Sequence, residues 1–282
     1  MKHEHKHYIR ERLEAFVNNQ AGSMKKAANM LKGVSIATIS NILSEKWDSI
    51  SEEMFRAIDA QITTDKNNGW QVVETRAYKL LQSWLGDAQQ HSLVMGITGD
   101  AGCGKTMGIS NYLMGARNCV VLRCKDYWNR KFFLAELLSA MGKNSNGDSL
   151  GEMMEEIVMT FKRMEKPVII LDEADKLSDQ VFYFFISLYN DLEDSCGIVL
   201  IATDHLEKRV KRGVRLNKKG YKEIYSRLGR KFIEIDPPSR VEIEAICRAN
   251  GLENLTEIKE IVQESEGDLR RVKRKVHALK AA

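Results

Sequence analysis

The stretch LVMGITGDAGCGKT occupies residues 93–106 and decides the predicted fold. Its first half is a short apolar run, as expected of a strand that is buried on both faces of a sheet. Its second half matches the pattern GxxxxGK[ST] and leads into a helical segment, the context in which this pattern forms a phosphate-binding loop. The predicted loop comprises Gly99, Asp100, Ala101, Gly102, Cys103, Gly104, Lys105 and Thr106.

The residue types of this loop suit a nucleotide. Glycines let consecutive backbone N–H groups point inward around an anion, and the helix that follows adds the positive end of its dipole. Lys105 can reach the β- and γ-phosphates, and the Thr106 hydroxyl can ligate Mg²⁺. A plain glycine turn between a strand and a helix would need neither side chain. The sequence therefore predicts ATP and Mg²⁺ as cofactors.

Four further apolar runs predict the rest of a sheet. The first three are short, continuous and rich in β-branched residues, as strands of a parallel sheet are. The runs cover 119–122, 168–171, 198–202 and 232–235, and helical patterns cover 75–89, 107–114, 132–141, 150–164 and 180–191. Alternating strands and helices are typical of an α/β domain, in which helices flank a parallel sheet.

Polar residues that follow two of these strands are the predicted catalytic groups. Asp172 ends the run at 168–171, where the ligand crevice of such a sheet lies, and suits an outer ligand of Mg²⁺. Glu173 beside it suits a general base that polarises the attacking water. Thr203, after the next strand, can orient that water. The alternative is structural, since acids also cap helices and threonine caps strands.

Composition and turn residues divide the chain into three predicted domains, 1–64, 65–236 and 237–282. The first contains short amphipathic helices and the second the predicted sheet. The third begins at Pro237-Pro238, which ends the last strand. Three helical patterns follow, at 240–250, 255–264 and 268–279, and predict a small helical lid.

The N-terminal domain has the layout of a helix-turn-helix. Ser23 and Ser35 can each cap a helix, and the glycine break at 32–34 separates the two. On the polar face of the second helix lie Ser35, Thr38 and Asn41, in the position that enters a major groove of DNA. A head of this kind can also bind protein, which stays open as an alternative.

Net charge differs strongly along the chain. The total of +4 from 43 basic and 39 acidic residues divides into +1 for residues 1–64, −5 for 65–204 and +8 for 205–282. The basic last part suggests a polyanionic partner. Five scattered cysteines without a CxxC pair, no signal peptide and no long apolar run predict a cytoplasmic protein that does not associate with membranes.

Two sets of cations are predicted to contact phosphates of double-stranded DNA. The first lies in the acid-free stretch 208–222, where Gly213 and Gly220 are expected to give flexibility, and includes Lys208, Arg209, Lys211 and Arg212. The second is interleaved with Tyr127 and Trp128 and comprises Arg123, Lys125, Arg130 and Lys131. For the first set, the alternatives are a solvated loop and contacts to the acidic face of a neighbouring subunit.

In this order, the segments GDAGCGKT, VIILDEADK, IATDH, YSRLGRKF and GDLRR resemble an AAA+ ATPase over about residues 75–282. The resemblance implies that Thr203 is a sensor residue and that Arg270 is a second sensor in the lid, with Arg271 as its competitor. It also implies an arginine finger that enters a neighbouring subunit's site, either Arg227 or Arg230. A site completed by its neighbour implies a head-to-tail oligomer, a ring or a filament.

Within that superfamily, a small helix-turn-helix head before a compact ATPase resembles the transposition target-selection ATPases of the phage Mu B type and their TnsC-like relatives. The resemblance implies non-specific DNA binding in the ATP state, assembly on DNA, a transposase as partner, and a bacterial or phage-infected cytosol. Three alternatives remain. They are a replication initiator or helicase loader, a metabolic phosphotransferase, and a protein-remodelling ATPase.

Overall fold

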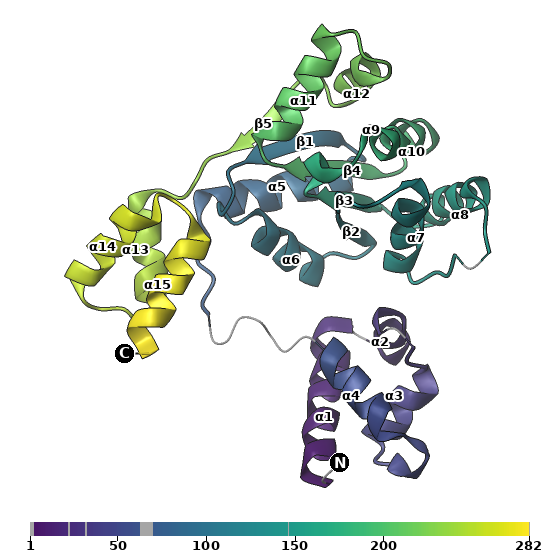
Figure 1. Ribbon diagram of the computed structural model, residues 1–282, viewed down its shortest axis with the longest axis vertical. Helices are drawn as coiled ribbons and strands as arrows, with labels where there is room; N and C mark the ends of the chain where they lie inside the picture. Colours follow the sequence, from purple (N-terminus) through teal and green to yellow (C-terminus); the bar gives the residue numbers. More distant parts are fainter. Residues whose placement is uncertain (1–2, 22, 32, 63–69, 146, 282) are drawn as a thin grey trace. The chain divides into compact units, whose positions relative to one another are not determined.

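The computed structural model describes residues 3–21, 23–31, 33–62, 70–145 and 147–281 (Figure 1). Contacts along the chain define two compact units, one of residues 1–69 with 138–145 and one of 70–137 with 146–282. No helix in the described ranges is long and apolar enough to cross a lipid bilayer.

The N-terminal residues form short helices around a small apolar core. Ser23 and Ser35 cap helices as predicted, because their hydroxyls accept hydrogen bonds from the backbone N–H groups of Lys26 and Thr38. Gly33 between them has a φ of +74°, a conformation that glycine adopts without strain. The elements are α1 (His3–Ala15), the π-helical η1 (Phe16–Ala21), α2 (Met24–Met30), α3 (Ile36–Leu43), the short η2 (Trp47–Ser49) and α4 (Glu52–Gln61).

The larger unit is built on a five-stranded parallel sheet with the strand order β2-β3-β4-β1-β5. All five strands lie where the apolar runs predict them, within one residue at each end. They are β1 (Val94–Gly99), β2 (Cys119–Arg123), β3 (Val168–Asp172), β4 (Gly197–Ala202) and β5 (Phe232–Ile235). The carboxyl ends of β1, β3 and β4, which are neighbours in this order, therefore meet at one edge of the sheet.

Helices cover the sheet because both of its faces are apolar. Leu81 and Leu85 of α5 and Ile109 of α6 belong to one buried cluster with the odd-numbered side chains of β1 and β4. The alternate residues Ile198 and Leu200 are equally buried on the other face. The flanking helices are α5 (Arg76–Gln90), α6 (Lys105–Gly115), α7 (Arg130–Ala140), α8 (Leu150–Lys162), the short η3 (Ala174–Lys176), α9 (Asp179–Phe182) and α10 (Phe184–Leu192).

Residues 204–227 differ from the sequence prediction. The flexible loop expected at 208–222 is instead two helices, α11 (Asp204–Arg215) and α12 (Tyr221–Arg227). Gly213 gives close packing rather than flexibility, because a Cβ atom there would lie 2.3 Å from the Tyr221 ring. Gly220 precedes α12 with a φ of +80°, which fixes the turn between the two helices.

Three helices end the chain as the sequence predicts, α13 (Arg240–Ala249), α14 (Leu255–Ser265) and α15 (Leu269–Ala281). They enclose their own apolar cluster, on which Trp70 and Val73 also pack. Asn250 fixes this contact, since its side chain exchanges hydrogen bonds of 2.8 and 3.0 Å with the backbone of Gln71. The segment before α5 is thereby held against the C-terminal helices.

Candidate functional site

The predicted phosphate-binding loop connects β1 to α6. Gly102 and Gly104 have φ angles of +87° and +101°, a region that other residues rarely adopt. A Cβ atom on Gly102 would lie 2.1 Å from the Asp268 carboxylate, so glycine is required there for space as well. The loop ends at the N-terminus of an eleven-residue helix, where backbone N–H groups and the helix dipole favour an anion.

Lys105 is the first residue of α6, and its side chain curls back over the loop. Its ammonium donates hydrogen bonds to the carbonyl oxygens of Gly99 and Asp100 at 2.6 and 2.8 Å. Both partners are neutral, so the positive charge of Lys105 is not neutralised by them. A phosphate group entering the loop would supply the missing negative charge.

Thr106 and Asp172 form the candidate magnesium site. The Thr106 hydroxyl donates to Asp172 Oδ2 at 3.1 Å, which links the start of α6 to the end of β3. Asp172 is only 3 % exposed, and this burial raises the pKa of its carboxyl group. A nearby divalent cation would offset that effect. A hydroxyl and a carboxylate oxygen are hard ligands of the kind that Mg²⁺ takes, so these residues fit the ion.

Glu173 is held by two cations. Its carboxylate accepts a hydrogen bond of 2.8 Å from Arg123 at the end of β2, and it also pairs with Lys176. The Arg123 bond is the largest of the effects that lower the pKa of Glu173 to about 2. Glu173 itself has a φ of +57°, a strained backbone of the kind that occurs at functional sites. Arg123, which the sequence grouped with DNA-binding cations, contacts the predicted base instead.

The Thr203 hydroxyl is oriented by the carboxylate of Asp175. Its hydroxyl donates to Asp175 Oδ2 at 3.0 Å, which joins the end of β4 to the short helix η3 after Glu173. Both residues line the same pocket as Glu173. The sequence motifs do not single out Asp175, whereas the structure makes it the partner of Thr203.

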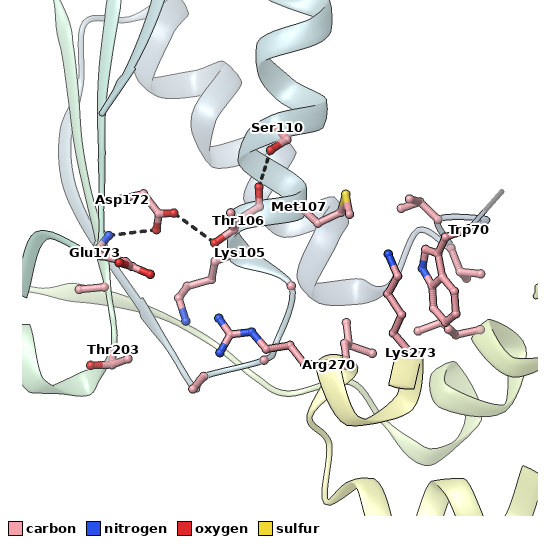
Figure 2. Close-up of a pocket in the computed structure, with 18 of the residues that line it drawn as sticks. Trp70, Lys105, Thr106, Met107, Ser110, Asp172, Glu173, Thr203, Arg270 and Lys273 are labelled. Carbon is pink, nitrogen blue, oxygen red and sulfur yellow. Dashed lines mark hydrogen bonds between the residues drawn. The ribbon is translucent and has the colours of Figure 1, made fainter. Parts of the chain in front are cut away.

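These groups line a pocket with a volume of about 430 Å³. Figure 2 shows Asp172, Glu173 and Thr203 at one end, Trp70 and Lys273 at the other, and Arg270 between them. The far end is apolar and adds Val72, Val73, Ile246 and Leu269 to the indole of Trp70. A polar end for phosphates and an apolar end for a base suit a nucleoside triphosphate.

The apolar end of this pocket was not predicted from the sequence. Trp70, Val72 and Val73 follow the polar stretch 63–69, and this return of apolar residues before α5 was the available signal. Lys273 reaches the same place from α15, where its ammonium lies 5.4 Å from the centre of the Trp70 ring. No single segment of the sequence contains both partners.

Arg270 belongs to the pocket, as the resemblance implies for the lid sensor. The turn before it is tied to the phosphate-binding loop, because the Leu269 N–H donates to the Gly102 carbonyl at 3.0 Å. Its competitor Arg271 pairs instead with Glu266 at 2.6 Å. This geometry favours Arg270 over Arg271 as the residue that faces a nucleotide.

Of the two candidate finger residues, Arg227 ends α12 and Arg230 lies in the turn that follows. Neither is among the described residues that line the pocket. Arg227 is engaged within the chain, where it pairs with Glu223 at 2.9 Å and donates to Asn190 at 2.6 Å. Arg230 is exposed and has a φ of +58° in the turn before β5.

The cations predicted to bind DNA have different surroundings. Lys125 is half-buried, while Arg130 and Lys131 are exposed at the start of α7 next to Tyr127, which is 72 % exposed. Of the two aromatic residues interleaved with these cations, Trp128 is buried and Tyr127 is exposed. On α11, Arg212 is exposed, and Lys208 and Lys211 pair with acids one turn earlier, Asp204 and Glu207.

Arg209 does not lie with these cations. Its guanidinium turns inward and binds Asp179, Tyr221 and backbone carbonyls, so the structure does not bring it to the surface predicted to bind DNA. In the N-terminal unit, Ser35 and Thr38 are hydrogen-bonded to each other at 2.9 Å at the start of α3, and Asn41 lies one turn further along.

Residues 87–210 match the family model described as an AAA domain. The matched segment runs from α5 into α11 and includes the phosphate-binding loop, Asp172, Glu173 and Thr203. The match supports a P-loop ATPase of the AAA type, with a five-stranded parallel sheet flanked by helices and nucleotide-dependent ATPase activity. A search among curated proteins finds no match to the chain.

We expect Arg123→Ala to increase basal ATP hydrolysis. Without the Arg123 hydrogen bond, the pKa of Glu173 rises from about 2 toward its usual 4.5. A stronger base should then raise kcat, by about tenfold if half of the pKa change is expressed in the rate. Because Glu173 then protonates at higher pH, the acid limb of the kcat/KM profile should also move upward.

Steady-state kinetics between pH 4.5 and 8 would measure both effects. The matched control is Arg117→Ala, which removes an exposed arginine outside the pocket. A rate that falls in Arg123→Ala, with no change in the profile, would show that Arg123 supports hydrolysis rather than restraining Glu173.

Proposed function

We propose that this protein is an ATP-dependent DNA-binding ATPase that assembles on duplex DNA and delivers target DNA to a transposase. The observation that carries the ATPase part is the pocket itself, in which a phosphate-binding loop, Thr106, Asp172 and Glu173 converge. The transposition part rests on the resemblance of the ATPase segments and of the helical head to target-selection ATPases.

In this proposal the residues of the pocket divide the work of hydrolysis. The loop and Lys105 bind the phosphates, and Thr106 and Asp172 would hold Mg²⁺, which neutralises charge on the β- and γ-phosphates when bound. Glu173 takes a proton from the attacking water, and Thr203 orients that water. Arg270 contacts the nucleotide from the C-terminal helices, so that nucleotide binding is coupled to the position of these helices, the lid.

DNA binding is supported by exposed cations at two places in the larger unit. Arg130 and Lys131 on α7, and Arg212 on α11, are exposed at helix surfaces where phosphates can reach them. Contacts of this kind give affinity without reading sequence. Ser35, Thr38 and Asn41 would add contacts from the N-terminal unit. In an oligomer, Arg227 or Arg230 would complete the pocket of a neighbouring copy.

The test is the ATPase rate with and without random-sequence duplex DNA, combined with electron microscopy of the ATP-bound protein. We expect duplex DNA to stimulate hydrolysis and the protein to form continuous filaments or rings on it. Replacing Arg130, Lys131 and Arg212 together by Ala should reduce the dependence of log K on log salt by about 0.9 for each phosphate that the variant no longer neutralises.

A charge-matched control replaces Arg117, Lys162 and Arg163 by Ala, all exposed and outside the pocket. Equal DNA binding by both triple variants would contradict the proposed surface. If wild-type protein shows no salt-sensitive affinity for DNA, a protein-remodelling ATPase is the better description. A discrete complex at one origin or on a helicase would favour the replication alternative.

A further inference from the structure

We propose that Arg209 is a positioning residue for ATP hydrolysis, which fixes the turn that carries Glu173 and couples this turn to α11 and α12. This inference rests on the proposed ATPase function. It concerns an arginine that the sequence placed among DNA-binding cations and that the structure turns into the protein.

Arg209 holds the backbone of the segment that follows Glu173. Its Nη1 donates to the carbonyl oxygens of Asp175 and Leu177 at 3.3 and 2.6 Å. These two residues flank the end of η3, which begins directly after Glu173. A planar guanidinium presents its donors in a fixed fork, so holding two carbonyls at once restricts the turn more than a single bond would.

The other donors of Arg209 reach the start of α9 and α12. Nη2 donates to Asp179 Oδ1 at 2.6 Å, and Nε donates to the Tyr221 hydroxyl at 2.9 Å. Tyr221 in turn donates to the same Asp179 oxygen at 2.6 Å, and Lys218 pairs with the other oxygen. The guanidinium also lies over the Phe182 ring, 5.0 Å from its centre.

The cluster of Arg209, Asp179, Lys218 and Tyr221 restrains the positions of its side chains. The Arg209 side chain is 24 % exposed and Tyr221 is 1 % exposed, so the hydrogen bonds are largely shielded from water. Burial alone would raise the pKa of the Asp179 carboxyl, but hydrogen bonds from Lys218, Tyr221 and Arg209 keep it below the usual range. Gly213 adds to the restraint, because only a residue without Cβ lets α11 approach the Tyr221 ring this closely.

The cluster therefore connects two groups of functional residues. On one side are Glu173 and Asp175, whose carboxylate holds the Thr203 hydroxyl at 3.0 Å. On the other side is α12, which ends at the candidate finger residue Arg227. A displacement of α11 or α12, by DNA or by a neighbouring copy, would move the Asp175 and Leu177 carbonyls and with them the base and the water-orienting hydroxyl.

The test compares wild-type protein with Arg209→Lys and Arg209→Ala under saturating duplex DNA. We expect kcat to fall about 10- to 100-fold in both variants, because small errors in the position of a catalytic group are costly and lysine cannot reproduce the fork. The Kd for ATP, from fluorescence titration with a labelled analogue, should change less than about threefold, since Arg209 does not line the pocket.

Arg163→Lys is the control for an exposed arginine. Tyr221→Phe removes one hydroxyl from the cluster and should lower kcat several-fold, even if Arg209→Ala does not fold. Unchanged kcat in Arg209→Lys would overturn this inference and leave the proposed ATPase function intact. So would parallel losses of ATP affinity, kcat and Tm, which indicate a merely structural role. Absence of hydrolysis by wild-type protein would overturn the proposed function, and this inference with it.

Discussion

Replacing Glu173 by Gln is expected to reduce kcat for ATP hydrolysis by about 10²- to 10⁴-fold, the range that a positioned general base contributes. Glutamine has nearly the same shape, and its amide oxygen can still accept the Arg123 hydrogen bond that the carboxylate accepts at 2.8 Å. The turn should therefore keep its geometry while the group that accepts the proton is lost. ATP affinity should remain within a few-fold of wild type.

If hydrolysis releases the protein from DNA, this variant should also remain bound. We expect ATP-loaded Glu173→Gln to form a complex on duplex DNA that outlives the wild-type complex, measured by dissociation after dilution. Glu165→Gln, which changes an exposed glutamate outside the pocket, is the matched control. Wild-type hydrolysis in Glu173→Gln would remove Glu173 from the mechanism. A hydrolysis-dead variant that leaves DNA as fast as wild type would separate release from hydrolysis.

The strands of the sheet and the helices that alternate with them could be predicted, because each has a recognisable apolar pattern in the sequence. Central strands of a doubly covered sheet read as continuous apolar runs, and the runs ending at Thr98, Leu171 and Ala202 placed the functional residues at strand ends. The helices α11 and α12 could not be predicted in this way. They are rich in cations, and they are stabilised by burial of Leu206, Val210 and Ile224. The packing of Gly213 on Tyr221 and the inward turn of Arg209 add to this.

The same distinction applies to the pocket. Lys105, Thr106, Asp172 and Glu173 were predictable because short motifs contain them. The hydrogen bond of Arg123 to Glu173 was not predicted, because it depends on the register of two strands, which places Arg123 opposite Asp172. Strands that are buried on both faces read as continuous apolar runs, so the alternation from which a register could be read is missing from their sequence. The pairing of Trp70 with Lys273 is equally hidden, since the two residues lie in segments far apart along the chain.

Replacing Lys105 by Ala is expected to weaken ATP binding by about 10- to 100-fold, the equivalent of one or two charged hydrogen bonds. The ammonium of Lys105 now has only the neutral carbonyls of Gly99 and Asp100 as oxygen partners among the described residues, at 2.6 and 2.8 Å. Its charge is therefore available to a phosphate, and the variant loses it without disturbing a buried ion pair.

The stability of Lys105→Ala should change little, which thermal unfolding would verify. ATP-dependent DNA binding, measured by fluorescence anisotropy with a labelled random duplex, should shift to about 10- to 100-fold higher ATP concentrations in Lys105→Ala. The control Lys162→Ala, which removes an exposed lysine from α8, should retain the wild-type ATP dependence. Intact ATP-dependent DNA binding in Lys105→Ala would contradict the proposed function at its first step, because the loop would then not be the site through which ATP controls the protein.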